Sequence, residues 1–454
     1  MYRVVRRTGD IFGDEPHVCE FVCDTADDVA TLPTSIAEGT GGKSKYDNQK
    51  CSAGSTAIIA TNSGSNSYIL NNSDVWIAQS SGSSGSGGSS GEDVELKIYP
   101  LDMNGMPTGD AIISEGITGL GLSDVNHTNY GPFNNNYNVT SVTFPKSMEK
   151  INKYSFNKAT NLKTVIFPAE CKIATISDYA FEKSGIENIT IPGSITTIGL
   201  YAFASMKNLK TVNLGTANVR LRSYAFQGSS LEHINFGSGN VELESNVFKE
   251  CNSLISVYIP ANVTLTSETE NVFYDCTKLE TVIFDDKHTF DKITKNFVRN
   301  CYALKTFVFP PLATSIGNNA FMYAGLETIN IPDSVTRIDA SAFSYMPNLI
   351  SVTLPSTITY ISYYPGKTMD AFYMSKAITT VNLGEGFKAN LSLANQIALT
   401  QETVSDIASK LYDYTGDADT HKICFNAAVY DAIPEDVMAV FAGKNWTVER
   451  STSS

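Results

Sequence analysis

Apolar and polar residues follow one short pattern that returns along most of this chain. The segment LKTVIFP at 162–168 recurs as LKTVNLG at 209–215, LETVIFD at 279–285 and LETINIP at 326–332. Its fourth and sixth residues are apolar, and residues two apart face the same side of a strand, so both are expected to point into a core. The copies begin at Val139, Leu162, Ile186, Leu209, Leu231, Leu254, Leu279, Leu304, Leu326, Leu349 and Ile378.

Successive copies begin at nearly equal intervals, and only the interval before the last copy is clearly longer. A period of roughly 23 residues is typical of a solenoid. One coil would fix its backbone at about 1–2 kcal/mol per residue while burying a handful of side chains worth about 1.5–3 kcal/mol each. A single coil therefore cannot fold alone. We expect the copies to stack into one continuous parallel sheet about 50 Å long.

Each copy continues with a turn, an Ile or Val, and then Ala-Phe or Val-Phe. The whole pattern resembles the BspA-like class of bacterial leucine-rich repeats, L-x-x-V-x-I-P-x-x-V-x-x-I-G-x-x-A-F-x-x-C, over residues 139–393. The resemblance implies an α/β-type solenoid dominated by β structure. The chain departs from the pattern at an insertion, SYYPGKTMD, at 362–370, and where the proline is missing, at Gly215, Gly237, Asp285 and Gly384.

The remaining parts of the chain have other patterns. Residues 1–80 contain the β-type runs HVCEFVC, STAIIAT, SYILNN and DVWIAQ and are expected to form a small all-β module. Residues 81–91, SGSSGSGGSSG, have the composition of a flexible linker, and 92–138 are expected to form a β hairpin and a degenerate first coil. Residues 394–454 combine helical periodicity with the strand-like runs KICFN and NWTVE, which predicts an αβ cap for the solenoid at 139–393.

Both ends of the chain carry a second resemblance. The runs CEFVCDTADDVATLPT, near the N-terminus, and LTQETVSDIASKLYDYTG, near the C-terminus, resemble modules of phage and prophage structural proteins of gut bacteria. This resemblance implies a tail or head fibre of a virion, a homotrimer assembled in the bacterial cytoplasm, whose N-terminal module contacts other virion proteins. The absence of a signal-peptide pattern at the first residues is consistent with that function.

The repeats by themselves support an alternative. Their resemblance implies a secreted or cell-surface BspA-like adhesin of a bacterium that binds host matrix proteins or other cells. In either case a bacterial surface or host component is the expected partner, and a solenoid with a long polar surface is expected to act as a recognition scaffold.

Charge and hydropathy exclude two classes of partner. The chain has a formal net charge of −14 and a pI near 4.9, whereas nucleic-acid binding needs clustered Lys and Arg. No stretch approaches 18 consecutive apolar residues, so membrane insertion is not expected.

The candidate chemical motifs are weak. The loop AEGTGGKS at 37–44 lacks the first glycine of a phosphate-binding loop. A zinc set of His17, Cys19, Cys23 and Cys51 does not have paired ligand spacing. A second group of cysteines recurs at intervals of 25 and is expected to form a column of buried thiols: Cys251, Cys276 and Cys301. We therefore expect a non-enzymatic protein without catalytic residues, metal or cofactor.

Candidate binding residues follow the repeat register. Tyrosines stand two residues before the Phe in four successive copies, where their rings could stack on sugars or on one another. Mutual stacking is favoured because the column keeps the register of the repeats. The candidate surface for a bacterial surface protein or glycan consists of Tyr154, Tyr179, Tyr201, Tyr224, Asn235, Tyr258, Tyr363 and Tyr364.

Overall fold

The computed structural model describes most of the chain as two compact units, Met1–Ser114 and Glu115–Ser454. Within them it describes residues 2–8, 18–23, 56–61, 64–70, 76–79, 98–101, 107–120, 133–266 and 268–452. Several features considered above lie outside these residues: the linker at 81–91, the loop at 37–44, His17 and Cys51.

The described part of the first unit is all β. One sheet has the strand order β1-β2-β3-β4-β5, and its neighbours are antiparallel except β2 and β3, which are parallel. Strands β2 to β5 coincide with the four runs expected from the sequence. Strand β1 was missed because YRVVRRT carries three arginines without strict alternation. The strands are β1 (Tyr2–Thr8), β2 (Val18–Cys23), β3 (Thr56–Thr61), β4 (Gly64–Leu70) and β5 (Trp76–Gln79), followed by the expected antiparallel hairpin of β6 (Ile98–Leu101) and β7 (Pro107–Ile113).

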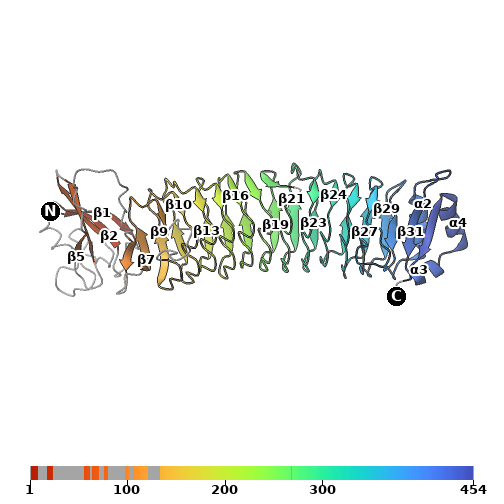
Figure 1. The fold of residues 1–454 in the computed structure, drawn as a ribbon, viewed down its shortest axis with the longest axis horizontal. Coiled ribbons are helices and arrows are strands. Elements are labelled where there is room, and N and C mark those ends of the chain that lie inside the picture. The colour runs from red at the N-terminus through yellow and green to blue at the C-terminus, as the bar shows by residue number, and fades with distance from the viewer. Residues whose placement is uncertain are drawn as a thin grey trace. The chain divides into compact units, whose positions relative to one another are not determined.

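The second unit is a solenoid with two short strands in each coil (Figure 1). Strands of successive coils pair in parallel, as expected for stacked repeats. The heptapeptide strands are β9 (Val139–Thr143), β11 (Thr164–Ile166), β13 (Asn188–Thr190), β15 (Thr211–Asn213), β17 (His233–Asn235), β19 (Ser256–Ile259), β21 (Thr281–Phe284), β23 (Thr306–Val308), β25 (Thr328–Asn330), β27 (Ser351–Leu354) and β29 (Thr380–Leu383).

A second series of strands follows the turn of each coil. They span two or three residues each, which is too short for a sequence pattern to show, but they also pair in parallel. These strands are β8 (Gly119–Leu120), β10 (Lys150–Ile151), β12 (Thr175–Ile176), β14 (Thr197–Ile198), β16 (Val219–Leu221), β18 (Val241–Leu243), β20 (Val263–Leu265), β22 (Lys292–Ile293), β24 (Ser315–Ile316), β26 (Arg337–Ile338) and β28 (Tyr360–Ile361).

The expectation of one continuous sheet has to be corrected. Strand pairing stops between β11 and β13, between β17 and β19, and between β23 and β25. The central inward residue of the strand before each break is only half-buried: Val165, Ile234 and Phe307. In strands that pair with the strand of the following coil, the residue at the same position is buried. The heptapeptide strands therefore form separate blocks, three of them three-stranded.

The core is a stack of equivalent side chains. In most coils the ring of the Phe packs on that of the next coil, as Phe156 does on Phe181, with centroids 4.9 Å apart and planes 3° apart. Each such pair stabilises the fold by about 0.5–1.5 kcal/mol beyond the free energy gained from burying the rings. Because the same position fills the core in every coil, each coil stabilises its two neighbours. The stacked rings include Phe133, Phe156, Phe181, Phe203, Phe226, Phe248 and Phe273, and then Phe321, Phe343 and Phe372.

The segment around this Phe forms the third side of each coil, here called the turn side. In most coils the residues two before and two after the Phe are left-handed; around Phe181 these are Tyr179 and Lys183, with φ of 58° each. Asn and Gly adopt this conformation at low cost, whereas Tyr and Lys do so less readily. Strained backbone conformations are therefore concentrated on the turn side.

The C-terminal cap covers the last coils. Helix α2 (Gln401–Lys410) begins at Thr400, whose Oγ1 accepts from the backbone N–H of Thr403 at 3.1 Å, and buries one face. The sequence expected α2, α4 (Glu435–Gly443) and the strands β31 (His421–Phe425) and β32 (Trp446–Arg450). Strand β31 pairs in parallel with β30 (Leu391–Leu393) on one side and with β32 on the other. The sequence missed α3 (Ala427–Asp431), a single turn. Within the described residues, no helix has the length and apolar composition needed to cross a lipid bilayer.

Candidate functional site

The side of the solenoid that carries the heptapeptide strands, here called the strand face, presents the second, third and fifth residues of each copy. Second-position residues of neighbouring coils include charges of opposite sign, and Lys305 Nζ and Glu280 Oε2 form an ion pair at 2.9 Å. Third-position residues are mainly small and uncharged: Thr164, Asn188, Thr211, Ser256, Thr281, Thr306, Thr328, Ser351 and Thr380. Such a face can form many weak polar contacts.

One block of this face is different. In β19, β21 and β23 the fifth position holds Tyr258, Ile283 and Val308, which lie opposite one another in the parallel register. Tyr258 is 52% exposed and Val308 43%, and Ile255 beside them in the second position is 44% exposed. These four residues are called the apolar patch. The fifth position of the preceding and following blocks is polar, with Asn235 in β17 and Asn330 in β25 among its residues.

The apolar patch has a polar edge. The phenol hydroxyl of Tyr258 donates to Asp285 Oδ2. That hydrogen bond raises the pKa of Tyr258 and lowers the pKa of Asp285. The tyrosine ring is thereby fixed over the turn that follows β21. An apolar centre with a polar rim is the usual anatomy of a protein interface.

The predicted tyrosine column is a ladder of stacked rings on the turn side. The centroids of Tyr154, Tyr179, Tyr201 and Tyr224 are 4.9, 5.0 and 4.8 Å apart, and successive planes differ by no more than 9°. The faces of Tyr179 and Tyr201 are covered by their neighbours, so a sugar ring could not stack on them. Burial, followed by Tyr154 and Tyr201, raises the pKa of Tyr179. The ladder leaves ring edges for contact with a ligand.

The column continues with asparagines. In the next four coils the same left-handed position holds Asn246, Asn271, Asn296 and Asn319. Asn296 Nδ2 donates to Asn271 Oδ1 at 2.7 Å, so these two amides are joined between neighbouring coils. The turn side thus changes from an aromatic to an amide column halfway along the repeats.

The two tyrosines of the insertion lie in different surroundings. The hydroxyl of Tyr363 donates to Glu449 Oε2 of the cap at 2.6 Å, and burial is the main cause of its raised pKa. Tyr364 is 45% exposed. Tyr363 therefore holds the insertion against the cap, and only Tyr364 is open to a partner.

The candidate residues do not form one site. The structure brings the four ladder tyrosines together on the turn side, places Asn235 and Tyr258 on the strand face, and leaves Tyr363 and Tyr364 at the insertion. Ile283 and Val308 were missed, although the signal was present. Tyr258, Ile283 and Val308 follow one another at equal intervals that match the repeat, which places them on consecutive coils.

The cysteine column is buried as expected. Each thiol donates to a backbone carbonyl of the preceding coil; Cys276 Sγ lies 3.1 Å from the carbonyl oxygen of Phe248. Burial raises the pKa of Cys251 to about 12 and also raises those of Cys276 and Cys301. These thiols stay protonated and serve packing. Among the described residues, no group of three or more His, Cys, Asp and Glu has a metal-binding arrangement.

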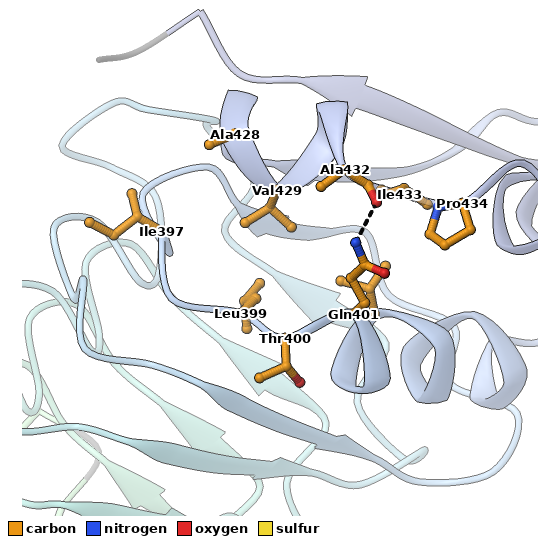
Figure 2. Close-up of a pocket in the computed structure, with 10 residues that line it drawn as sticks. Ile397, Leu399, Thr400, Gln401, Ala428, Val429, Ala432, Ile433 and Pro434 are labelled. Carbon is orange, nitrogen blue, oxygen red and sulfur yellow. Dashed lines mark hydrogen bonds between the residues drawn. The ribbon is translucent and has the colours of Figure 1, made fainter.

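The cap contains an apolar groove of about 340 Å³ between the start of α2 and α3 (Figure 2). Ile397, Leu399 and Val429 line it, and Gln401 Nε2 donates across it to the carbonyl oxygen of Ala432 at 2.8 Å. All of its lining side chains are uncharged. The groove therefore offers apolar contact and no acid or base.

Comparison with known proteins identifies the repeat. A family model described as BspA type leucine-rich repeat region (6 copies) matches residues 126–255, 174–290 and 266–392. These ranges together cover more than half of the 454 residues. A search of curated proteins finds no match.

Several solved structures align with much of this chain. A leucine-rich cell surface protein from Faecalibacterium prausnitzii is 18% identical and aligns over 66% of this chain and 95% of its own, with a TM-score of 0.31. A leucine-rich repeat protein from Eubacterium ventriosum is 18% identical over 71% and 75%, with a TM-score of 0.38. The pneumococcal vaccine antigen PcpA is 16% identical over 79% and 96%, with a TM-score of 0.36.

Proposed function

Because the chain belongs to the BspA-type leucine-rich repeat family, we propose that it is a non-enzymatic adhesion scaffold of the bacterial cell surface. Its solenoid binds a protein of the host matrix or of another cell. The strand face carries this contact, with the apolar patch at its centre and the polar residues of the neighbouring blocks around it.

The observation that supports the proposal most directly is the apolar patch. Exposed apolar side chains that gather on one surface and are rimmed by polar groups commonly mark interaction sites. Here they fill one three-stranded block, while the blocks on both sides are polar at the same position. A rigid stack of parallel strands holds them in place, so binding costs little ordering of the protein.

The patch can be tested with matched substitutions. We expect Tyr258→Ser combined with Val308→Ser to weaken binding of the purified chain to immobilised host matrix and to intact cells by at least tenfold. The control is Ile166→Ser, which removes an equally exposed apolar residue (47%) from the same position of β11. Equal losses from the control and the patch variant, or no loss from either, would show that the patch is not the contact.

A second candidate is a virion fibre that binds a bacterial surface receptor. The resemblance of both chain ends to phage structural modules favours it, as does the compact N-terminal unit, which could attach the chain to other virion proteins. In this function, the fragment 1–79 should copurify with phage particles and a fragment starting at Glu92 should not. In the adhesin function, antibodies to the chain should label intact bacterial cells, and neither fragment should follow particles.

A further inference from the structure

A pocket of about 390 Å³ lies on the turn side, next to the insertion. Successive coils supply its lining, and the insertion supplies one wall through Thr368 and Met369. The other residues that matter here are Arg299, Asn318, Ser341 and Tyr345. Neither the strand face nor the tyrosine ladder includes this pocket.

Arg299 is unusual among the arginines of the described solenoid and cap. The other four described guanidinium groups lie near carboxylates: Arg220 and Arg222 near Glu244, Arg337 near Asp339, and Arg450 near Asp431. Arg299 has no carboxylate oxygen of a described residue within ion-pair distance. In a chain with a net charge of −14, this cation without a counter-ion is a local positive site.

The guanidinium is positioned by neutral groups. Its Nη1 lies 3.4 Å from Asn296 Oδ1, and its Cζ lies over the ring of Tyr274, 5.5 Å from the centroid. Its Nε is buried and has no hydrogen-bond partner among the described residues, so a ligand would meet the Nη1 and Nη2 end of the guanidinium. The cation is therefore oriented, and its Nη2 donates to no described residue.

Neutral polar and apolar groups complete the pocket. Asn318 Oδ1 accepts from the backbone N–H of Ala340 at 3.1 Å, and its amide NH2 group donates to no described residue. Tyr345 is held by stacking on Tyr323, with centroids 4.9 Å apart. The side chain of Met369, which is half exposed, adds an apolar wall. The pocket thus combines one cation, free amide donors, a phenol and an apolar surface.

The insertion is fixed in the position that forms this wall. Ser341 Oγ donates to the carbonyl oxygen of Thr368, and Ser344 Oγ donates to that of Asp370 at 3.2 Å. Ser362 Oγ donates to the carbonyl oxygen of Met369 at 2.7 Å, which closes the loop on itself. The pocket therefore exists before any ligand binds.

We propose that this pocket binds one residue of an acidic sugar, a uronic acid, through its carboxylate. This inference rests on the proposed function and adds a ligand class to it. The planar fork of Arg299 matches a carboxylate in two parallel hydrogen bonds. Asn318 and Tyr345 can bond sugar hydroxyls, and Met369 can pack on the ring. The volume is at the small end of ligand pockets, about 300–1,000 Å³, which suits one sugar residue.

An acidic peptide fits less well. A Glu or Asp side chain would use Arg299 but would leave the amide of Asn318 and the phenol of Tyr345 without the hydroxyl groups that a sugar supplies. A sugar can therefore make more hydrogen bonds in the pocket than a carboxylate side chain alone, so the sugar is the favoured ligand.

The test is calorimetric titration of the full chain with trigalacturonate, with its fully methyl-esterified form and with an acetylated Glu-Glu peptide. The ester keeps the rings and hydroxyls but removes the charge. We expect trigalacturonate to bind at least tenfold more tightly than either of the other probes. Failure of trigalacturonate to bind, equal binding of the ester, or tighter binding of the peptide would overturn the proposal.

Three variants assign the binding to the pocket. Arg299→Gln and Asn318→Asp should each weaken trigalacturonate binding at least tenfold. Asn318 is exposed, and aspartate can still accept from Ala340, so this variant adds a negative charge without disturbing the fold. Arg220→Gln makes the same change in net charge as Arg299→Gln on a distant coil and should bind like wild type. Binding that survives in both pocket variants, or that falls equally in the control, would place the sugar elsewhere and refute the inference.

Adhesion distinguishes this inference from the proposed function. If Arg299→Gln loses trigalacturonate but still binds host matrix through the apolar patch, both proposals hold. If the wild type binds matrix and cells but no uronate, only the pocket assignment is wrong. If it binds uronate but neither matrix nor cells, the adhesion proposal falls and the pocket assignment stands.

Discussion

Asp370, the last residue of the insertion, carries a carboxyl group that should make the stability of the solenoid depend on pH. It is 2% exposed; Oδ2 accepts from Ser392 Oγ, and Oδ1 has no hydrogen-bond partner among the described residues. Burial raises the pKa of Asp370 from 3.8 to about 7, and the Ser392 hydrogen bond opposes this rise. The pKa of Asp370 is higher in the folded chain than in the unfolded chain. The protonated carboxyl therefore contributes to the free energy of unfolding below about pH 4, and this contribution is lost as the pH rises to about 7.

We predict that Asp370→Asn stabilises the solenoid at pH 8. A rise from 3.8 to about 7 corresponds to an upper limit of about 4 kcal/mol, at about 1.4 kcal/mol per unit. The amide still has a partner, because the Ser392 hydroxyl can accept as well as donate. The rise of the pKa is already the net of burial and of the opposing Ser392 hydrogen bond, so that hydrogen bond is not subtracted again. The expected gain is therefore up to about 4 kcal/mol at pH 8 and close to zero at pH 4.

Urea unfolding between pH 4 and pH 8 measures this difference. Hydrogen exchange of the backbone amides of 362–371 should be recorded as well, because coils of a solenoid can open locally. Asp333→Asn, at an exposed position of a neighbouring coil, is the control and should change stability little at any pH. A gain that is the same at pH 4 and pH 8, or a loss at pH 8, would show that Asp370 is not a buried charge in the folded chain.

Three further predictions test the packing of the repeats. Ile329→Asp should lower the free energy of unfolding, measured with urea, by at least about 3 kcal/mol because it buries a charge. Asn330→Asp changes the outward-facing neighbour and should alter the free energy of unfolding by less than about 0.5 kcal/mol. Equal effects would mean that the inward and outward positions are misassigned. Iodoacetamide should label Cys171 of the native chain before Cys251, because Cys251 is buried and its pKa is raised to about 12. Mass spectrometry measures the order of labelling, and early labelling of Cys251 would contradict this packing. Removing 363–369 should preserve the circular dichroism spectrum, because Ser362 at one edge of the cut already accepts a backbone hydrogen bond of 3.1 Å from Ala371, one residue beyond the other edge. The deletion should weaken trigalacturonate binding at least tenfold; unchanged binding would show that the insertion forms no part of the pocket.

Much of the fold could be predicted because a repeat converts intervals in sequence into contacts in space. The interval of one repeat places Tyr154 beside Tyr179 and Cys251 beside Cys276, and the structure stacks both pairs of positions. The same rule could have revealed the apolar patch, since Tyr258 and Ile283 are also one repeat apart. The cap helices were predictable from their own periodicity and from the need to cover the last apolar coil.

The sequence by itself therefore determined the stack of coils, its columns of side chains and its covered end. Only the tertiary structure showed where strand pairing breaks, because whether neighbouring coils pair depends on small differences in how each coil packs, which a period does not encode. It also brought Arg299 to the wall formed by Thr368, which lies several coils later in the chain. The insertion has no repeat partner that fixes its path, so its place follows from the hydrogen bonds made by Ser341, Ser362 and Tyr363.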